Sequence, residues 1–169
     1  MSDDLYEAIQ VPQAPAASSD AVRAVFLANR RRDTAPELAL RRALFARGMR
    51  FLVDVAPAGM SKRRRVDVLL RGSRIAVLVH GCFWHCCPVH FVMPTRNREW
   101  WAVKFSAIKH RDADTEVKLV EAGWLVIVVW EHEPAELAAS RIHAQHAARR
   151  VQRPRTEPPR TSSGHPCEA

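Results

Sequence analysis

Residues His80 to His90 concentrate the side chains that most often bind metal ions in proteins. Six of these eleven residues are Cys or His, namely His80, Cys82, His85, Cys86, Cys87 and His90. A structural zinc ion takes four nitrogen or sulfur ligands in a tetrahedron, and the Cys82-x4-Cys87-x2-His90 spacing could supply three of them. Cys86 could replace Cys87, and His85 could replace His90. The alternative is a reduced cysteine cluster with surface histidines, but thiols so close together without a metal would be open to oxidation.

The fourth zinc ligand must come from another part of the chain. His132 directly follows the apolar run Leu125 to Glu131, which is typical of a central strand. If this strand lies beside a strand over Ile75 to Val79, its end reaches the same edge of the sheet as Cys82. We therefore expect His132 to be the fourth ligand.

Asp67 interrupts the apolar run Val66 to Leu70, where strand alternation places it on the face opposite Val66 and Val68. A hairpin would bring Asp67 near residues 77–80 of the partner strand. A carboxylate there could hold Mg²⁺ together with a main-chain carbonyl, the oxygen-rich site that phosphodiester hydrolysis favours. On these residues alone, an ion pair of Asp67 with Arg65 or Arg74 is an equal alternative.

Two further carboxylates occupy informative positions. Asp112 interrupts a mostly apolar helical stripe and, if buried, needs a partner, which could be a histidine, a metal-bound water or a structural arginine. The stripe comprises Trp101, Phe105, Ile108, Asp112, Thr115 and Leu119. Glu37 is the fourth residue of the capping box Thr34-Ala35-Pro36-Glu37, so these residues alone predict that it caps a helix.

Aromatic and basic residues flank the Cys/His stretch. The aromatic residues are Phe83, Trp84, Trp100 and Trp101, and the basic residues are Lys62, Arg63, Arg64, Arg65, Arg96 and Arg98. Cations beside aromatic rings indicate nucleic acid, with phosphate contacts and stacked or inserted rings. The alternatives are that the tryptophans belong to the core, as we expect for Trp124 and Trp130, and that the charge run is a solvated loop.

The elements that must position these residues follow from hydrophobic periodicity and from Pro and Gly signals. We expect helices over 20–29, 35–47, 94–122 and 134–150, and strands over 51–55, 66–70, 75–79 and 124–130. Residues 56–65 read as a basic loop, and Gly72-Ser73 as the turn of a hairpin. This order predicts an α/β or α+β chain with a mixed sheet and helices packed on it.

Length and composition limit the number of domains and the class of partner. The 169 residues fit one folded domain over 19–150, with a flexible N-terminal tail over 1–18 and a disordered, basic, Pro-rich tail over 151–169. The net charge of +8 favours an acidic polymer as partner. Apolar runs far shorter than a bilayer span and an acidic N-terminal segment predict no membrane and no secretion, and the few clustered cysteines favour the cytoplasm.

Three segments together resemble the very short patch repair (Vsr) endonucleases. They are Arg32-Asp33-Thr34-Ala35-Pro36-Glu37, His80-Gly81-Cys82-Phe83-Trp84-His85 and the run Trp124 through Trp130-Glu131. The resemblance spans residues 19 to 135 in order, and the Gly-Cys-Phe-Trp-His core is highly specific to that family. It implies a restriction-endonuclease-like α/β fold, in which a central mixed β-sheet is flanked by helices. It also implies a structural zinc site.

The resemblance also implies an activity and roles for individual residues. The implied enzyme depends on Mg²⁺ and nicks one DNA strand 5′ of the thymine in T·G mismatches that arise by deamination of 5-methylcytosine. Asp67 matches the metal-binding aspartate, Val79 supplies a main-chain carbonyl to the metal, and His85 matches the histidine that activates water. Asp112 would support that histidine. Glu37 and His80 match positions that touch metal-bound waters.

The remaining implications concern zinc, DNA and partners. Cys82, Cys87, His90 and His132 resemble one variant of the family's zinc site, although Cys86 stands where cysteine is uncommon. Phe83, Trp84 and Trp101 match aromatic residues that wedge into the duplex beside the mismatch, and residues 21–29 match an element that grips DNA. The expected partners are mismatched duplex DNA, DNA repair proteins and an associated cytosine-5 methyltransferase, with the chain acting as a monomer at the nucleoid.

Overall fold

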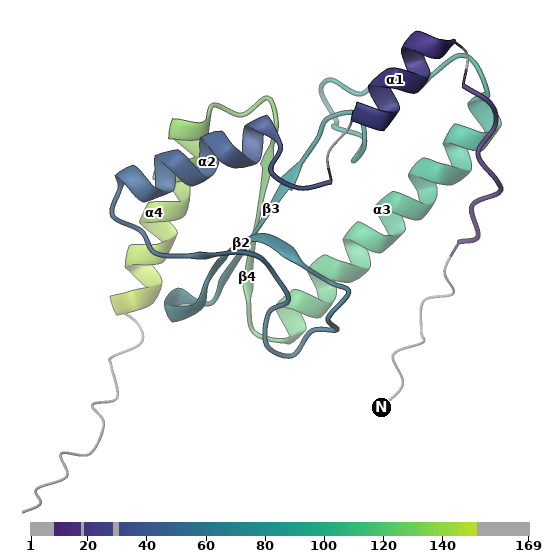
Figure 1. Cartoon of the computed structure of the whole chain (residues 1–169). Helices are drawn as coiled ribbons and strands as arrows, with labels where there is room; N and C mark the ends of the chain where they lie inside the picture. Colours follow the sequence, from purple (N-terminus) through teal and green to yellow (C-terminus); the bar gives the residue numbers. More distant parts are fainter. Residues whose placement is uncertain (1–8, 18, 29–30, 152–169) are drawn as a thin grey trace, which may run out of the picture.

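The computed structural model describes residues 9–17, 19–28 and 31–151 (Figure 1). Its helices are α1 (Asp20–Ala28), α2 (Ala35–Ala46), α3 (Arg98–Glu121) and α4 (Ala135–Val151), and its strands are β1 (Leu52–Val55), β2 (Val66–Leu70), β3 (Ile75–His80) and β4 (Leu125–Trp130). A short 3₁₀ turn, Arg71–Ser73, joins β2 to β3. Half of the predicted N-terminal tail, residues 1–8 and 18, lies outside the described residues, as do residues 152–169 of the predicted C-terminal tail and residues 29 and 30.

The four strands form one mixed sheet in the order β1-β2-β3-β4. β1 and β3 each pair with β2 in antiparallel fashion, whereas β3 and β4 are parallel. The register pairs Val68 with Val77 across the hairpin and Val79 with Val129 across the parallel pair. The predicted mixed α/β sheet and hairpin are therefore confirmed.

Helices cover both faces of this sheet (Figure 1). One face packs against α2 and α4 through a core that includes Leu44, Val77 and Ile142. The other face packs against the C-terminal part of α3, where Leu119 contacts a core that includes Leu78 and Trp124. Because strand side chains alternate between the two faces, the apolar β2 and β3 can supply both cores.

The boundaries differ most from the prediction at the start of α3. We expected this helix to begin at Pro94-Thr95, but it begins at Arg98. Asn97 adopts a left-handed conformation with φ of 54°, which a helix cannot continue through and which Asn tolerates better than most residues. Residues 91–97 therefore form an irregular connection between the Cys/His stretch and α3.

Among the helices of the described residues, none combines the length and the apolar character that a bilayer-spanning segment needs.

The contact between α3 and the sheet should dominate the stability contributed by this helix. Leu119 is fully buried, whereas the next residue, Val120, is 60% exposed. We expect Leu119→Ala to lower the free energy of unfolding by about 2 to 5 kcal/mol, because it removes buried methyl groups and leaves a cavity. Val120→Ala, the matched control, should change it by no more than about 0.5 kcal/mol. Urea denaturation of both variants measures the two effects, and equal losses would contradict this packing.

Candidate active site

The carboxyl ends of β3 and β4 are fastened together by Glu131. Its backbone N–H donates to the carbonyl of His80 at 2.9 Å, and its carboxylate accepts the backbone N–H of Cys82 at 2.8 Å. The chain after β3 and the chain after β4 therefore meet at one edge of the sheet. His132 and the Cys/His stretch are brought together there, as the strand placement predicted.

Four side chains at this edge form a tight group of potential metal ligands. The ligand atoms of Cys82, Cys87, His90 and His132 all lie within 4.8 Å of one another. Nδ1 of His132 lies 3.1 Å from Sγ of Cys82 and 3.7 Å from Sγ of Cys87, and Nδ1 of His90 lies 3.9 Å from Sγ of Cys87. Zinc–ligand bond lengths place sulfur and nitrogen ligands about 3.6 Å apart in a tetrahedron. The donor set and its spacing therefore fit a structural zinc ion.

The structure also separates the alternative ligands. Cys86, with a left-handed φ of 52°, lies outside this group of four. Burial raises the pKa of its thiol, and the charged groups that influence it are Lys109 and Asp112 rather than the other cysteines. His85 belongs to a different cluster. The geometry thus favours Cys87 over Cys86, and His90 over His85.

That second cluster joins His85 to α3. Nδ1 of His85 lies 2.6 Å from a carboxylate oxygen of Asp112, and the ring of His85 stacks on the ring of His80 with centroids 3.9 Å apart. Burial works to raise the pKa of Asp112, but the hydrogen bond with His85 and nearby positive charges hold it below its usual value. The partner of Asp112 is therefore a histidine, one of the options that its place on the helical stripe left open.

His80 supports this pair without adding charge. Burial, followed by the neighbouring His85, lowers the pKa of His80 to about 4. His80 is therefore neutral near pH 7, so it packs against His85 without repelling its protonated form. With Nδ1 of His85 bonded to Asp112, the ring atom that can exchange a proton with water is Nε2. This arrangement is that of a histidine oriented by a carboxylate for general-base catalysis.

Asp67 lies against the backbone of the partner strand. Its carboxylate accepts the backbone N–H of Val79 at 2.6 Å, which confirms the predicted approach of Asp67 to this end of β3. The alternative ion pairs are not formed, because Arg65 pairs with Asp54 and Arg74 donates to the carbonyl of Ala122. Burial raises the pKa of Asp67 to about 6; the bond from Val79 opposes the rise, and the negative charge of Glu37 adds to it.

Glu37 is buried at the start of α2, where its carboxylate is held by the residues just before the helix and by Arg41. Its carboxylate accepts the backbone N–H of Asp33 at 3.1 Å and the hydroxyl of Thr34 at 2.9 Å. Arg41, one turn further along α2, donates to the same carboxylate at 2.6 Å and to Asp33 at 2.5 Å. The predicted capping box is not formed, because Thr34 makes no side-chain cap bond and Glu37 accepts the backbone N–H of Asp33 rather than that of Thr34. The influence of Glu37 on the pKa of Asp67 places the two carboxylates near each other. Arg41 had no motif to mark it in the sequence.

Comparisons with known proteins show the family to which this chain belongs. The family model for DNA mismatch endonuclease Vsr matches residues 18–89. The type II nicking enzyme V.NaeI of Lentzea aerocolonigenes is 38% identical over 125 residues, which cover 70% of this chain and 75% of that protein. The chain belongs to the Vsr family.

Two further relatives extend the comparison. The type II nicking enzyme V.XorIIP of Xanthomonas oryzae pv. oryzae is 33% identical over 112 residues, 65% of this chain and 79% of that protein. DNA mismatch endonuclease Vsr of Escherichia coli is 36% identical over 101 residues, 59% of this chain and 62% of that protein. The family model ends at residue 89, so Asp112, His90 and His132, which the sequence analysis had singled out, lie outside its match, and the structure brings them into the two clusters.

The aromatic residues of this Vsr-family chain form one cluster beside His85. The ring of Phe83 lies 5.1 to 5.4 Å from the rings of Trp84, Trp101 and Phe105. Phe105 is buried, whereas Phe83, Trp84 and Trp101 are half-buried. Trp100, by contrast, donates its indole N–H to the carbonyl of Pro12 in the N-terminal segment. A half-buried aromatic surface next to the candidate base is compatible with the predicted wedge.

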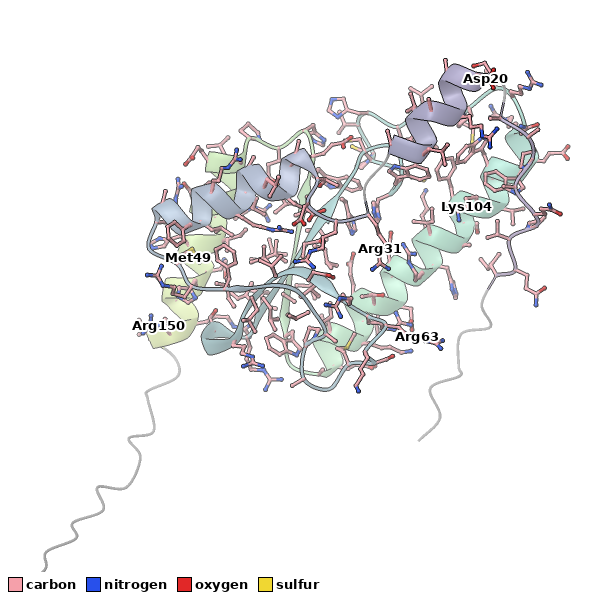
Figure 2. All side chains as sticks on the ribbon, viewed as in Figure 1. Asp20, Arg31, Met49, Arg63, Lys104 and Arg150 are labelled. Carbon is pink, nitrogen blue, oxygen red and sulfur yellow. The ribbon has the colours of Figure 1, made fainter. Side chains whose placement is uncertain are left out.

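The four cations of the basic loop, residues 56–65, do not share one environment. Lys62 and Arg63 are exposed and available for phosphate groups. Arg64 instead forms an ion pair with the buried Asp114, and Arg65 pairs with Asp54 at 2.6 Å. Figure 2 labels Arg63 near the lower end of α3 in this view and Lys104 on the helix itself. Of the four consecutive cations, only Arg64 is drawn into a buried pair, whereas Arg65 stays exposed while it pairs with Asp54.

The buried Asp67 should lower the stability of the metal-free protein. A raised pKa means that the folded protein holds this proton more tightly than the unfolded chain, whose carboxyl titrates near 3.8, so the ionised carboxylate disfavours folding above a pH of about 6. We expect Asp67→Asn, in EDTA near neutral pH, to raise the free energy of unfolding by about 1 to 3 kcal/mol.

The same reasoning sets the pH dependence and the control. The advantage of Asp67→Asn should disappear as the pH falls from about 6 to about 4, since the wild-type carboxyl then becomes neutral as well. Asp54→Asn removes an ion-paired carboxylate on the neighbouring strand and should not stabilise the protein. Denaturant unfolding over this pH range measures the effect, and an Asp67→Asn variant less stable than the wild type throughout would contradict it.

Proposed function

We propose that this chain is an Mg²⁺-dependent endonuclease that nicks one strand of duplex DNA 5′ of the thymine in a T·G mismatch. The observation that carries the proposal is the assembly of Asp67 from β2, His85 from the loop after β3 and Asp112 from α3 at one end of the sheet. His85 is close enough to Asp67 to influence its pKa. A carboxylate beside a carboxylate-oriented histidine is the minimal set for metal-assisted phosphodiester hydrolysis.

The residues divide the work as follows. Asp67 and the main-chain carbonyl of Val79 would hold Mg²⁺, which when bound supplies positive charge to the scissile phosphate. His85 takes a proton from the attacking water at Nε2, while Asp112 fixes the ring through Nδ1. His80 excludes water from the stacked face of that ring and stays neutral. Glu37, held by Arg41, would contact water bound to the metal.

Recognition of a mismatch fits the surface beside these groups. Inserting aromatic side chains into a duplex requires unstacking, which is easiest where base pairing is already weak. Phe83, Trp84 and Trp101 form such a half-buried group within the same loop and helix that carry His85 and Asp112. The family's description as mismatch endonucleases and the names of two relatives as nicking enzymes support cleavage of one strand at a mismatch.

A zinc ion bound by Cys82, Cys87, His90 and His132 would fasten the loop that carries His85. The loop contains no helix or strand and is closed mainly by backbone bonds such as Cys87 N–H to the carbonyl of Cys82 at 2.9 Å. Four ligands from its two ends and from the chain after β4 would fix it to the sheet. A DNA-binding module without catalysis would need this zinc and the basic surface, but not the buried Asp67 or the His85–Asp112 pair.

The nicking assay tests the function directly. With Mg²⁺, we expect the wild type to nick the thymine strand of a T·G duplex and to leave the matched C·G and T·A duplexes intact, with EDTA abolishing cleavage. Flanking sequences should be varied, because cleavage requires a suitable context. His85→Ala should keep DNA binding but lose about 10²- to 10⁴-fold in single-turnover rate, because proton transfer is removed. Equal nicking of T·G and paired duplexes would refute mismatch specificity.

The zinc assignment is tested by two neighbouring cysteines. We expect the purified wild type to contain about one equivalent of zinc, and Cys87→Ser to lose most of it and to unfold at a lower temperature. Cys86→Ser is the matched control, since Cys86 lies outside the ligand group, and it should keep both the zinc and the melting temperature. Elemental analysis with thermal unfolding provides both readouts. Zinc loss in Cys86→Ser with retention in Cys87→Ser would reverse the assignment.

A further inference from the structure

The most deeply buried carboxylate of α3 among the described residues is one to which the catalytic scheme gives no role. Asp114 is 2% exposed, whereas a buried charge is tolerated only when it is paired. Its carboxylate forms an ion pair with Arg64 of the basic loop and lies 3.3 Å from the ammonium group of Lys118, one turn along α3. The pair with Arg64 joins residues fifty positions apart, so it ties the loop to the helix.

Arg64 makes a second contact that leads towards the candidate base. Its other terminal nitrogen donates to the hydroxyl of Thr115 at 2.6 Å. That hydroxyl in turn donates to the main-chain carbonyl of Arg111 at 2.7 Å. Arg111 directly precedes Asp112, which holds His85. A continuous chain of polar contacts therefore runs from the loop to the turn of α3 that orients the histidine.

The loop is fixed to the C-terminal end of α3 at a second place. The indole N–H of Trp124 donates to the carbonyl of Ala58 at 3.1 Å. Gly59 has a positive φ of 87°, and a side-chain carbon added there would lie 3.2 Å from the side chain of Ala122. The loop is thus held at both ends of its basic run. Lys62 and Arg63, between the two anchors, remain exposed.

The positions of these contacts in the sequence suggest their purpose. Arg64 lies three residues before Asp67, and Asp114 lies two residues after Asp112. The metal-binding carboxylate and the carboxylate that orients the base come from different elements, β2 and α3. We propose that the bridge from Arg64 to Asp114 and Thr115 is a positioning device that sets these two halves of the active site relative to each other. Arg64 is then a positioning residue and not a DNA contact.

This inference rests on the proposed nicking function and separates two kinds of variant. A positioning residue affects the rate of the bound complex, because small displacements of catalytic groups are costly. A phosphate contact affects the dissociation constant and its dependence on salt. We expect Arg64→Gln to lower the single-turnover nicking rate at saturating enzyme on the order of 10- to 100-fold, with a much smaller change in affinity for the same duplex.

Asp114→Asn gives the sharper test. Asp114 is buried and negative, so it cannot contact DNA, and its removal alone should slightly strengthen DNA binding by long-range electrostatics. We nevertheless expect it to lower the saturating rate as much as Arg64→Gln does, and the double variant to lose no more than either single one. Arg64→Lys should recover the rate only in part, since an ammonium group cannot bridge Asp114 and Thr115 as a guanidinium does.

Two matched variants serve as controls. Arg63→Gln removes the adjacent exposed cation, so it should weaken DNA binding. The slope of the logarithm of the binding constant against the logarithm of the salt concentration should become smaller by about one, because one fewer counterion is released. Arg47→Gln breaks a comparable bridge, to Glu136 between α2 and α4, and should change neither the rate nor the affinity. All variants are assayed below their measured melting temperatures.

The outcomes that would overturn the proposal are distinct. It is wrong if Arg64→Gln behaves as Arg63→Gln does, if Arg64→Lys is fully active, or if Asp114→Asn nicks at the wild-type rate. Should the wild type nick no duplex at all, the proposed function fails, and the bridge is still tested by limited trypsin digestion. Cleavage after Lys62 or Arg63 in the folded protein should then be faster in Asp114→Asn than in the wild type, and equal rates would show that the bridge does not hold the loop.

Discussion

The parallel pairing of β3 with β4 is the constraint on which the rest of the site depends. Parallel strands end at the same edge of a sheet, so the chain leaving β3 and the chain leaving β4 must meet there. The register pairs His80 with Trp130, and Glu131 then binds the backbone on both sides of Gly81. His132 can reach the two cysteines only because this register holds. A slip by one residue would turn His80 away from His85 and separate the four side chains proposed to bind zinc.

The features that could be predicted from the sequence are those that depend on local periodicity. Alternation along β2 and a short hairpin turn were enough to place Asp67 beside Val79, and the apolar run of β4 placed His132. The choice between Cys86 and Cys87 could not be made, because it depends on a left-handed residue in an irregular loop. Regular spacing carries no information about such a loop.

The largest omission was Asp114, and its cause is geometric. The stripe on α3 that pointed to Asp112 assumes that the helix buries one face. In the structure the turn of α3 that carries Asp112 and Asp114 also lies under the basic loop, so a second face of the helix is covered. Asp114 is buried on that face against Arg64. Arg64 and Arg65 were grouped with Lys62 and Arg63 for the same reason, since their acidic partners come from α3 and β1. Which cations remain free for DNA is a property of the tertiary structure.

The site also shows where this fold accepts unfavourable electrostatics. Burial raises the pKa of Asp67 to about 6, and the bond from the N–H of Val79 and the electrostatic influence of Arg41 and His85 oppose this rise. Asp112 has a direct partner in His85 and shows the opposite shift. The two carboxylates thus lie in environments that suit the different tasks proposed for them, one to bind a cation and one to orient a base. Their separation into two environments is the basis of the proposed chemistry.

The most direct test of this account is a double-mutant cycle on His85 and Asp112, measured as the single-turnover nicking rate of a T·G duplex at saturating enzyme and Mg²⁺. If Asp112 acts through the hydrogen bond to His85, then Asp112→Asn should slow nicking strongly when His85 is present. The same substitution should have almost no effect in the His85→Ala background. If the two losses multiply, or if Asp112→Asn nicks at the wild-type rate, His85 and Asp112 do not act as one unit and the central claim is wrong.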